Sequence, residues 1–195
     1  RDGLLPLGFL RESAESLERA DVVVISHAEM VEQEALGELR NWVAQQVSEG
    51  TVVSVVTHRW DRIVEYGVDG ERVADHPIEK IQNLPVAVLT GIGHPEAFVS
   101  MAVAEGAKIS HRCDRPDHDH FSDTTVADFL DASGASDASA ILTTNKDWTK
   151  LKARLNGVNS SGCLRVLVPG LGLGFQSGEA DLKAACLSVF VSQED

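Results

Sequence analysis

The sequence has few cysteines, few basic residues and no long hydrophobic run, and each shortage excludes a class of protein. Its three cysteines, Cys113, Cys163 and Cys186, include no close pair. A disulfide framework or a zinc knuckle is therefore not expected, and a reducing cytoplasm fits best. The chain has 17 Lys and Arg residues against 30 Asp and Glu residues. This excess of negative charge argues against binding to nucleic-acid backbones and against a polybasic segment that binds anionic lipid headgroups. No apolar run approaches the about 20 residues of a spanning helix.

The length and composition fit one sizeable globular domain. The chain has 195 residues, of which 43% are apolar, so intrinsic disorder is not expected. It begins at Arg1, and its only methionines are Met30 and Met101. We therefore expect a piece of a longer protein, in which further motifs lie upstream.

Short apolar runs alternate with helical patterns along the chain. The runs predict buried strands at residues 21–25, 51–56, 86–89, 108–110, 140–142 and 164–168. Helices are predicted at about 13–20, 28–48, 95–105, 122–133, 146–156 and 178–191. This alternation predicts an α/β fold with a largely parallel sheet flanked by helices. Residues 58–84 break the rhythm and are predicted as an inserted excursion, with a turn at 66–71, in a single lobe of residues 1–195.

Residues 116–121 (PDHDHF) place two carboxylates and two imidazoles in consecutive positions after a predicted strand. Three interpretations compete: an acid/base pair of Asp117 and His118, a metal site that includes His120, and an ordinary solvated loop. Strand-like alternation would put the carboxylates on one face and the imidazoles on the other, so the four side chains could not all coordinate one ion. The Asp117–His118 pair is the most economical functional interpretation, and no metal ligands are predicted.

Other polar or glycine-rich segments follow predicted strands. Residues 91–95 (GIGHP) follow a predicted strand and open a helix, where the glycines and the helix N-terminal amides could bind an anion or could simply form a tight turn. Residues 143–147 (TTNKD) close a strand, where Thr144 and Lys146 could hold a phosphate, or a threonine could simply cap the next helix. Residues 170–178 (GLGLGFQSG) are predicted as a flexible connection, because Ser177 stands where a third nucleotide-loop glycine belongs.

The sequence lacks a phosphate-loop motif, and it gives four of its histidines no identifiable partner. No G-x-x-x-x-G-K-[ST] phosphate loop occurs in the chain. The remaining histidines, His27, His58, His76 and His111, have no convergent partner that the sequence alone identifies.

Four segments in this order resemble the C-terminal half of the tetraacyldisaccharide 4'-kinase family, the lipid A 4'-kinases. Residues 5–13 (LPLGFLRES) resemble the family's L-P-x-G-x-L-R-E-P, and residues 91–98 (GIGHPEAF) its G-I-G-N-P-x-x-F. Residues 116–121 resemble P-D-H-H-x-F, and residues 143–147 resemble T-T-E-K-D. The resemblance covers about residues 3–26 and 84–155. Departures are Ser13 for Pro, His94 for Asn, Asn145 for Glu, and Asp119 between the two histidines.

The resemblance implies a P-loop-kinase-like lobe that lacks the P-loop itself, with the N-terminal P-loop lobe outside this chain. It implies ATP and Mg²⁺ as cofactors and transfer of the γ-phosphoryl group to the 4'-hydroxyl of a lipid A disaccharide precursor. The fragment alone is expected to be inactive. The implied location is cytoplasmic, with peripheral attachment at the cytoplasmic face of the inner membrane.

The resemblance also assigns expected roles to residues. His118 supports the catalytic acid of the other lobe, and Asp117 fixes His118. Arg11 and Glu12 contact nucleotide or magnesium near the lobe junction, whereas Thr144 and Lys146 are lower-ranked cofactor-binding residues. Two rival hypotheses remain: a non-catalytic α/β module that binds a sugar phosphate or a protein partner, and a metal-dependent hydrolase that uses Asp117, His118 and His120.

Overall fold

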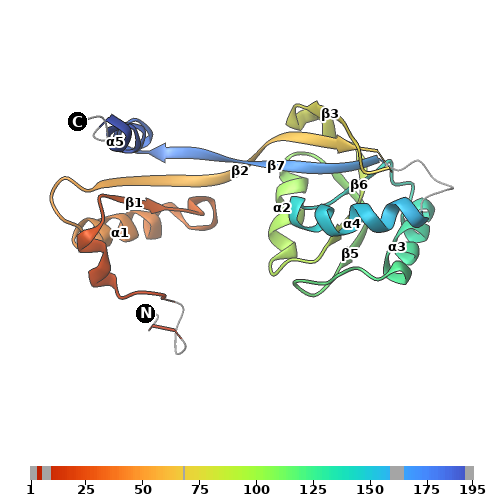
Figure 1. Cartoon of the computed structure of the whole chain (residues 1–195), viewed down its shortest axis with the longest axis horizontal. Coiled ribbons are helices and arrows are strands. Elements are labelled where there is room, and N and C mark those ends of the chain that lie inside the picture. Colours follow the sequence, from red (N-terminus) through yellow and green to blue (C-terminus); the bar gives the residue numbers. More distant parts are fainter. Residues whose placement is uncertain (1–3, 6–9, 68, 159–164, 192–195) are drawn as a thin grey trace. The chain divides into compact units, whose positions relative to one another are not determined.

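The computed structural model describes residues 4–5, 10–67, 69–158 and 165–191, and it divides the chain into two compact units (Figure 1). Unit 1 comprises Arg1–His58 and Leu173–Asp195, and unit 2 comprises Arg59–Gly172. Two long strands, β2 (Val52–Tyr66) and β7 (Arg165–Ser177), have residues in both units. Each unit has a hydrophobic core of its own.

Unit 1 is built around a parallel strand pair. Its elements are η1 (Ala14–Arg19), β1 (Val22–Ile25), η2 (Ala28–Met30), α1 (Gln33–Ala44), the first half of β2, the end of β7 and α5 (Glu179–Val191). β1 pairs with β2 in parallel, with Val22 opposite Val52 and Ile25 opposite Val55. The apolar face of α1 covers the two strands, and Leu36 on this face is buried against them.

Unit 2 holds the larger sheet. Its further elements are β3 (Arg72–His76), η3 (Ile78–Ile81), β4 (Pro85–Thr90), α2 (Pro95–Ala104), β5 (Lys108–Asp114), α3 (Asp123–Ala135), β6 (Ala140–Leu142) and α4 (Asn145–Val158). The strand order there is β2-β7-β6-β4-β5, and β3 pairs with β2 in antiparallel fashion. β4, β5, β6 and β7 are mutually parallel. Figure 1 shows α2, α3 and α4 gathered around these strands.

The sheet of unit 2 is buried on both faces. Val86 and Val88 of β4 belong to one apolar cluster, which includes Phe98 of α2. Ala87 and Leu89 belong to another cluster, with residues of α3 and α4. Alternate side chains of a strand point to opposite faces, so the continuous apolar run of β4 suits a strand covered by helices on both sides.

The α/β class and the largely parallel sheet are confirmed, and most element boundaries lie within a few residues of their predicted positions. Ser122 caps α3, since its hydroxyl oxygen accepts the backbone N–H of Thr125 at 3.1 Å. Residues 58–84 contain the continuation of β2, then β3 and η3, with the turn at 66–71 between two paired strands. The predicted helix at 28–48 is two elements, η2 and α1.

The predicted flexible connection at residues 170–178 is wrong, because β7 continues through it to Ser177. Glycine lowers strand propensity, but pairing with β2 supplies the backbone partners. A β-carbon at Gly170 would lie 2.7 Å from Cγ of Arg62, and one at Gly172 would lie 2.9 Å from Oδ2 of Asp61. These glycines therefore make room for side chains of the neighbouring strand.

Within the described ranges, every helix is too short or too polar to cross a bilayer.

Candidate functional site

The carboxyl ends of three parallel strands of unit 2 bring together segments that are far apart in the sequence. Residues 91–94 follow β4, residues 115–122 follow β5, and residues 143–144 follow β6. Because these strands are parallel, their connecting loops emerge at one edge, the usual place for ligand-handling groups in α/β proteins. Three of the four segments named from the sequence thus meet at this edge.

Asp147 is the buried centre of this edge. Its side chain is fully buried, and its Oδ2 accepts the backbone N–H of Gly91 at 3.0 Å and the hydroxyl of Thr144 at 2.8 Å. The backbone N–H of Asp147 in turn donates to Thr144 Oγ1 at 3.1 Å, so Thr144 caps α4. Lys150 Nζ lies 3.5 Å from the other carboxylate oxygen. These bonds tie the loop after β4 to the start of α4.

Asp119 holds the loop after β5 in shape. Its carboxylate accepts the backbone N–H of Phe121 at 2.6 Å and the Nε–H of Arg115 at 3.2 Å. The Phe121 N–H is the main cause that holds the pKa of Asp119 below its usual value, despite the opposing effect of desolvation. Phe121 is fully buried with a φ of 50°, so this loop has an unusual but well-anchored backbone.

Asp117, His118 and Lys146 form the exposed polar cluster of the edge. Lys146 donates to Asp117 Oδ1 at 2.7 Å, and the backbone N–H of His118 donates to the same oxygen at 2.9 Å. The hydrogen bond from Lys146 is the largest cause that lowers the pKa of Asp117. His118 has a φ of 65°, and its imidazole is 78% exposed.

The predicted Asp117–His118 pair is therefore made through the backbone of His118. The imidazole Nε2 lies 3.7 Å from Asp117 Oδ2, which is beyond hydrogen-bond distance. Lys146, ranked lower from the sequence, is the side chain that Asp117 binds. The cluster thus presents an ammonium group, a carboxylate and a solvent-facing imidazole, which together can bind an anion and accept or deliver a proton.

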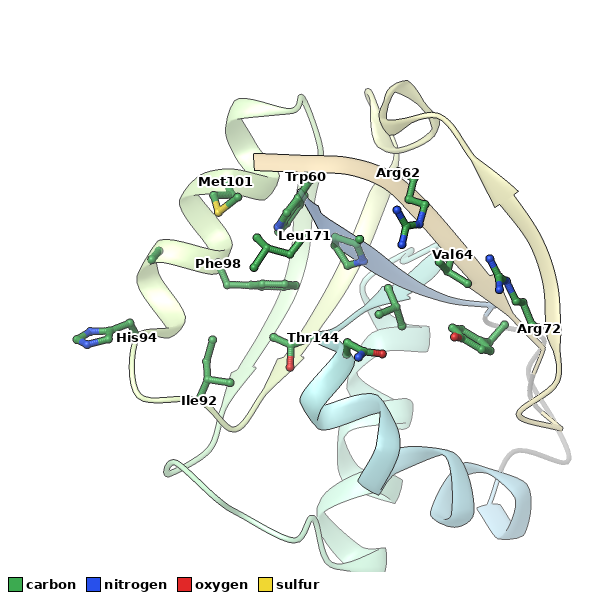
Figure 2. A pocket seen from close by; sticks show the side chains of 16 residues that line it. Trp60, Arg62, Val64, Arg72, Ile92, His94, Phe98, Met101, Thr144 and Leu171 are labelled. Atoms are coloured by element: carbon green, nitrogen blue, oxygen red, sulfur yellow. The ribbon is translucent and has the colours of Figure 1, made fainter. Parts of the chain in front are cut away.

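A cavity of about 630 Å³ lies beside this edge within unit 2 (Figure 2). Figure 2 shows Thr144, Ile92 and His94 along one side and Arg62 and Arg72 on another. The large apolar side chains Trp60, Phe98, Met101 and Leu171 also line the cavity. The wall combines apolar surface with two guanidinium groups, which suits a ligand with both apolar and anionic parts.

Arg11 and Glu12 lie in unit 1, on the segment before η1. Glu12 is ion-paired with Arg19, whose hydrogen bond is the largest cause that lowers the pKa of Glu12. Both residues line a hollow of about 550 Å³ that also includes Trp42. Residues 6–9 of the same sequence segment lie outside the described residues.

The ligands of the rival hydrolase hypothesis do not converge. Asp117, His118 and His120 do not form a group in which three ligating atoms come close together. Among the residues that the structure describes, the one such group is His27, Glu29 and His58. Sequence reasoning found no partner for these histidines, and it gave Asp147 no role. An aspartate three residues after a capping threonine was the available signal for Asp147.

The sequence matches the model of one protein family, described as tetraacyldisaccharide-1-P 4'-kinase, over residues 1–185. The chain is 26% identical over 152 residues to a tetraacyldisaccharide 4'-kinase of Halothermothrix orenii, covering 75% of this chain and 39% of the relative. It is 30% identical over 152 residues to the enzyme of that name from Anaeromyxobacter sp. (strain K), covering 78% and 39%. The chain thus spans about two fifths of the length of these relatives.

A solved structure has a similar fold. The crystal structure of LpxK from Aquifex aeolicus in complex with ATP superposes with a TM-score of 0.62 and 23% identity. The superposition covers 97% of this chain and 49% of that chain.

Proposed function

Because the chain belongs to the tetraacyldisaccharide-1-P 4'-kinase family, we propose that it is the C-terminal lobe of a lipid A 4'-kinase. The intact kinase would transfer the γ-phosphoryl group of ATP to the 4'-hydroxyl of a lipid A disaccharide precursor. On this proposal the phosphate loop belongs to a lobe outside these 195 residues, which contain no G-x-x-x-x-G-K-[ST] sequence. The 195-residue chain alone would then turn over no substrate.

The bond between Lys146 and Asp117 is the observation that supports this proposal most directly. It joins two segments of the family resemblance that are 29 residues apart in the sequence. Gly91 of a third segment is bonded to Asp147, next to Lys146. A folded edge that assembles three family segments around a cation, a carboxylate and an imidazole is the arrangement expected of phosphoryl-transfer chemistry.

Each side chain has a role in the proposal. Asp117 fixes the backbone of His118, and the exposed imidazole of His118 supports the acidic group of the other lobe that orients the sugar hydroxyl. Lys146 binds a phosphate oxygen, a task for which its position at the edge and its positive charge suit it. Thr144 positions Lys146 by capping α4 and by donating its hydroxyl hydrogen to Asp147.

The residues also fit the cofactors. ATP supplies the transferred group, and Mg²⁺ neutralises the phosphates. Glu12 offers the carboxylate oxygens that Mg²⁺ prefers, and Arg11 offers a guanidinium group that matches a phosphate. The Glu12–Arg19 ion pair is 60–70% exposed on both sides, so Glu12 can exchange that partner at little cost. The enzyme would act at the cytoplasmic face of the inner membrane.

Steady-state kinetics of the intact kinase with His118→Ala test the proposal. We expect a fall in kcat of about 100-fold, the usual contribution of a group that assists proton transfer. The KM for ATP should stay unchanged. His120→Ala is the matched control, since it removes a neighbouring imidazole with no proposed role. Normal turnover by a folded His118→Ala enzyme would overturn the role proposed for His118, whereas absence of kinase activity in the unaltered intact protein would favour a non-catalytic module.

A further inference from the structure

Two histidines and a glutamate of unit 1 meet at the end of β1. The parallel register that sets Ile25 opposite Val55 brings His27, just past β1, near His58 of β2. Glu29 in η2 lies beside both, with Oε1 3.4 Å from Nδ1 of His27 and 3.6 Å from Nδ1 of His58. One ligating atom from each of the three residues lies within 4.8 Å of the others.

The spacing of these atoms matches a metal coordination sphere. Ligands of a tetrahedral zinc ion with bonds of about 2.0 to 2.2 Å are about 3.3 to 3.6 Å apart. The two distances from the Glu29 carboxylate to the imidazoles agree closely with this value. The Glu29 carboxylate therefore already lies at the separation that two ligands of one ion would have from each imidazole.

A ring nitrogen of His58 gives independent support for a missing ligand. Its Nδ1 atom is buried and has no hydrogen-bond partner in the structure. Buried nitrogen atoms of side chains normally have a partner, because an unpaired one loses its hydration without compensation. A metal ion between His58 and Glu29 would satisfy that lone pair.

The surroundings hold the ligands in place. Glu29 Oε2 accepts the backbone N–H of His58 at 3.0 Å, which orients the carboxylate and leaves Oε1 facing the imidazoles. The two imidazole rings are stacked, with centroids 3.9 Å apart and planes inclined by 26°, so the exposed His27 ring must rotate for both rings to direct a nitrogen lone pair at one ion. His27 takes a left-handed backbone conformation with a φ of 58°, which turns the chain from β1 into η2.

We propose that His27, Glu29 and His58 bind a divalent transition-metal ion, Zn²⁺ in the first instance. Imidazole nitrogen favours such ions over Mg²⁺, which prefers oxygen ligands. Three protein ligands leave one coordination position open. The His27 side chain is 59% exposed, so that position is accessible to water or to an anionic ligand.

Calorimetric titration of the metal-stripped 195-residue chain with ZnCl₂ tests the site. We expect one Zn²⁺ per chain, no comparable binding of Mg²⁺, and a loss of Zn²⁺ affinity of at least tenfold in Glu29→Gln and His58→Gln. His120→Ala is the matched control, because it removes an imidazole of the rival cluster and should leave Zn²⁺ binding unchanged. Absence of saturable binding, or binding that Glu29→Gln and His58→Gln both retain, would overturn the proposal.

Two further measurements separate loss of the site from loss of the fold. His27→Asn keeps a residue that tolerates positive φ, so it should fold normally yet lose Zn²⁺ affinity. Zn²⁺ should raise the Tm of the unaltered chain, as any ligand of the folded state does, but not that of His27→Asn. Co²⁺ bound at the site should show the intense visible absorption of a tetrahedral ion, and a spectrum of fully hydrated Co²⁺ would contradict the site.

Discussion

Two carboxylates at the same edge of the unit 2 sheet differ in their exposure to solvent and in the groups that they bind. Asp147 is fully buried and binds the backbone of Gly91 and the hydroxyl of Thr144. Asp117 is 42% exposed and binds Lys146, itself 43% exposed. The first carboxylate builds the edge, and the second remains available to a ligand. The contribution to folding and the contribution to chemistry thus come from different carboxylates, one in the first turn of α4 and the other in the loop after β5.

Removal of the buried carboxylate should give the largest effect. In Asp147→Ala the N–H of Gly91 and the hydroxyl of Thr144 lose their acceptor inside the protein. We expect the free energy of unfolding to fall by roughly 3 kcal/mol, measured by urea denaturation. Asp147→Asn keeps an acceptor oxygen and should cost about 1 kcal/mol. Asp117→Ala should lower the stability by less than about 1 kcal/mol, because its ion pair is exposed, and a similar loss in both alanine variants would break the distinction.

A substitution at Gly91, where the loops after β4 and β5 are in contact, should have an intermediate effect on stability. A β-carbon there would lie 3.0 Å from Cζ of the buried Phe121 and 3.4 Å from Oδ1 of Asp147. Gly91→Ala should therefore destabilise the chain by about 1 to 2 kcal/mol through overpacking. Gly93→Ala is the matched control, because its β-carbon would meet Asp117 Oδ2 at an ordinary 3.6 Å.

A double-mutant cycle identifies the cause of the Gly91→Ala loss. Phe121→Leu removes the ring atom that the new methyl group would meet, so Gly91→Ala should cost less in that background. Equal costs in the two backgrounds would show that Phe121 does not transmit the strain between the loops.

The sequence predicted the class of fold because local patterns determine most of it. The apolar run of β4 and the Ser122 cap of α3 are both readable from neighbouring residues. The glycines of β7 misled the prediction, since pairing with β2 outweighs their low propensity for strands. The extent of that strand is a property of the sheet, which the local sequence does not record.

The candidate site was predicted in part for the same reason. The sequence identified Asp117, His118 and Lys146, but it paired Asp117 with the imidazole of its neighbour. The structure shows that the carboxylate instead binds a lysine 29 residues away. Likewise, His27 and His58 meet only because β1 and β2 are paired in parallel. Both contacts depend on strand order and register, which local spacing does not reveal.

The exposed ion pair should show the smallest effect on stability but a clear effect on ionisation. Lys146 is the main cause of the lowered pKa of Asp117, with a further contribution from the charge on His118. Lys146→Met should therefore raise the pKa of Asp117 toward its usual value, as measured by NMR titration of the side-chain carboxyl. Lys150→Met is the control, because Lys150 contacts Asp147 and the backbone of Asp119 instead.

The sign of the pH dependence follows from the direction of this shift. A carboxyl whose pKa is lower in the folded state stabilises the fold above its unfolded pKa, and this contribution is lost as the pH falls through the folded value. Lys146→Met should therefore lose less stability than the unaltered chain between neutral pH and acid. Added NaCl should reduce the difference, because exposed charges are screened. An unchanged pKa of Asp117 in Lys146→Met would show that its backbone contact with His118, and not Lys146, controls the ionisation of this carboxylate.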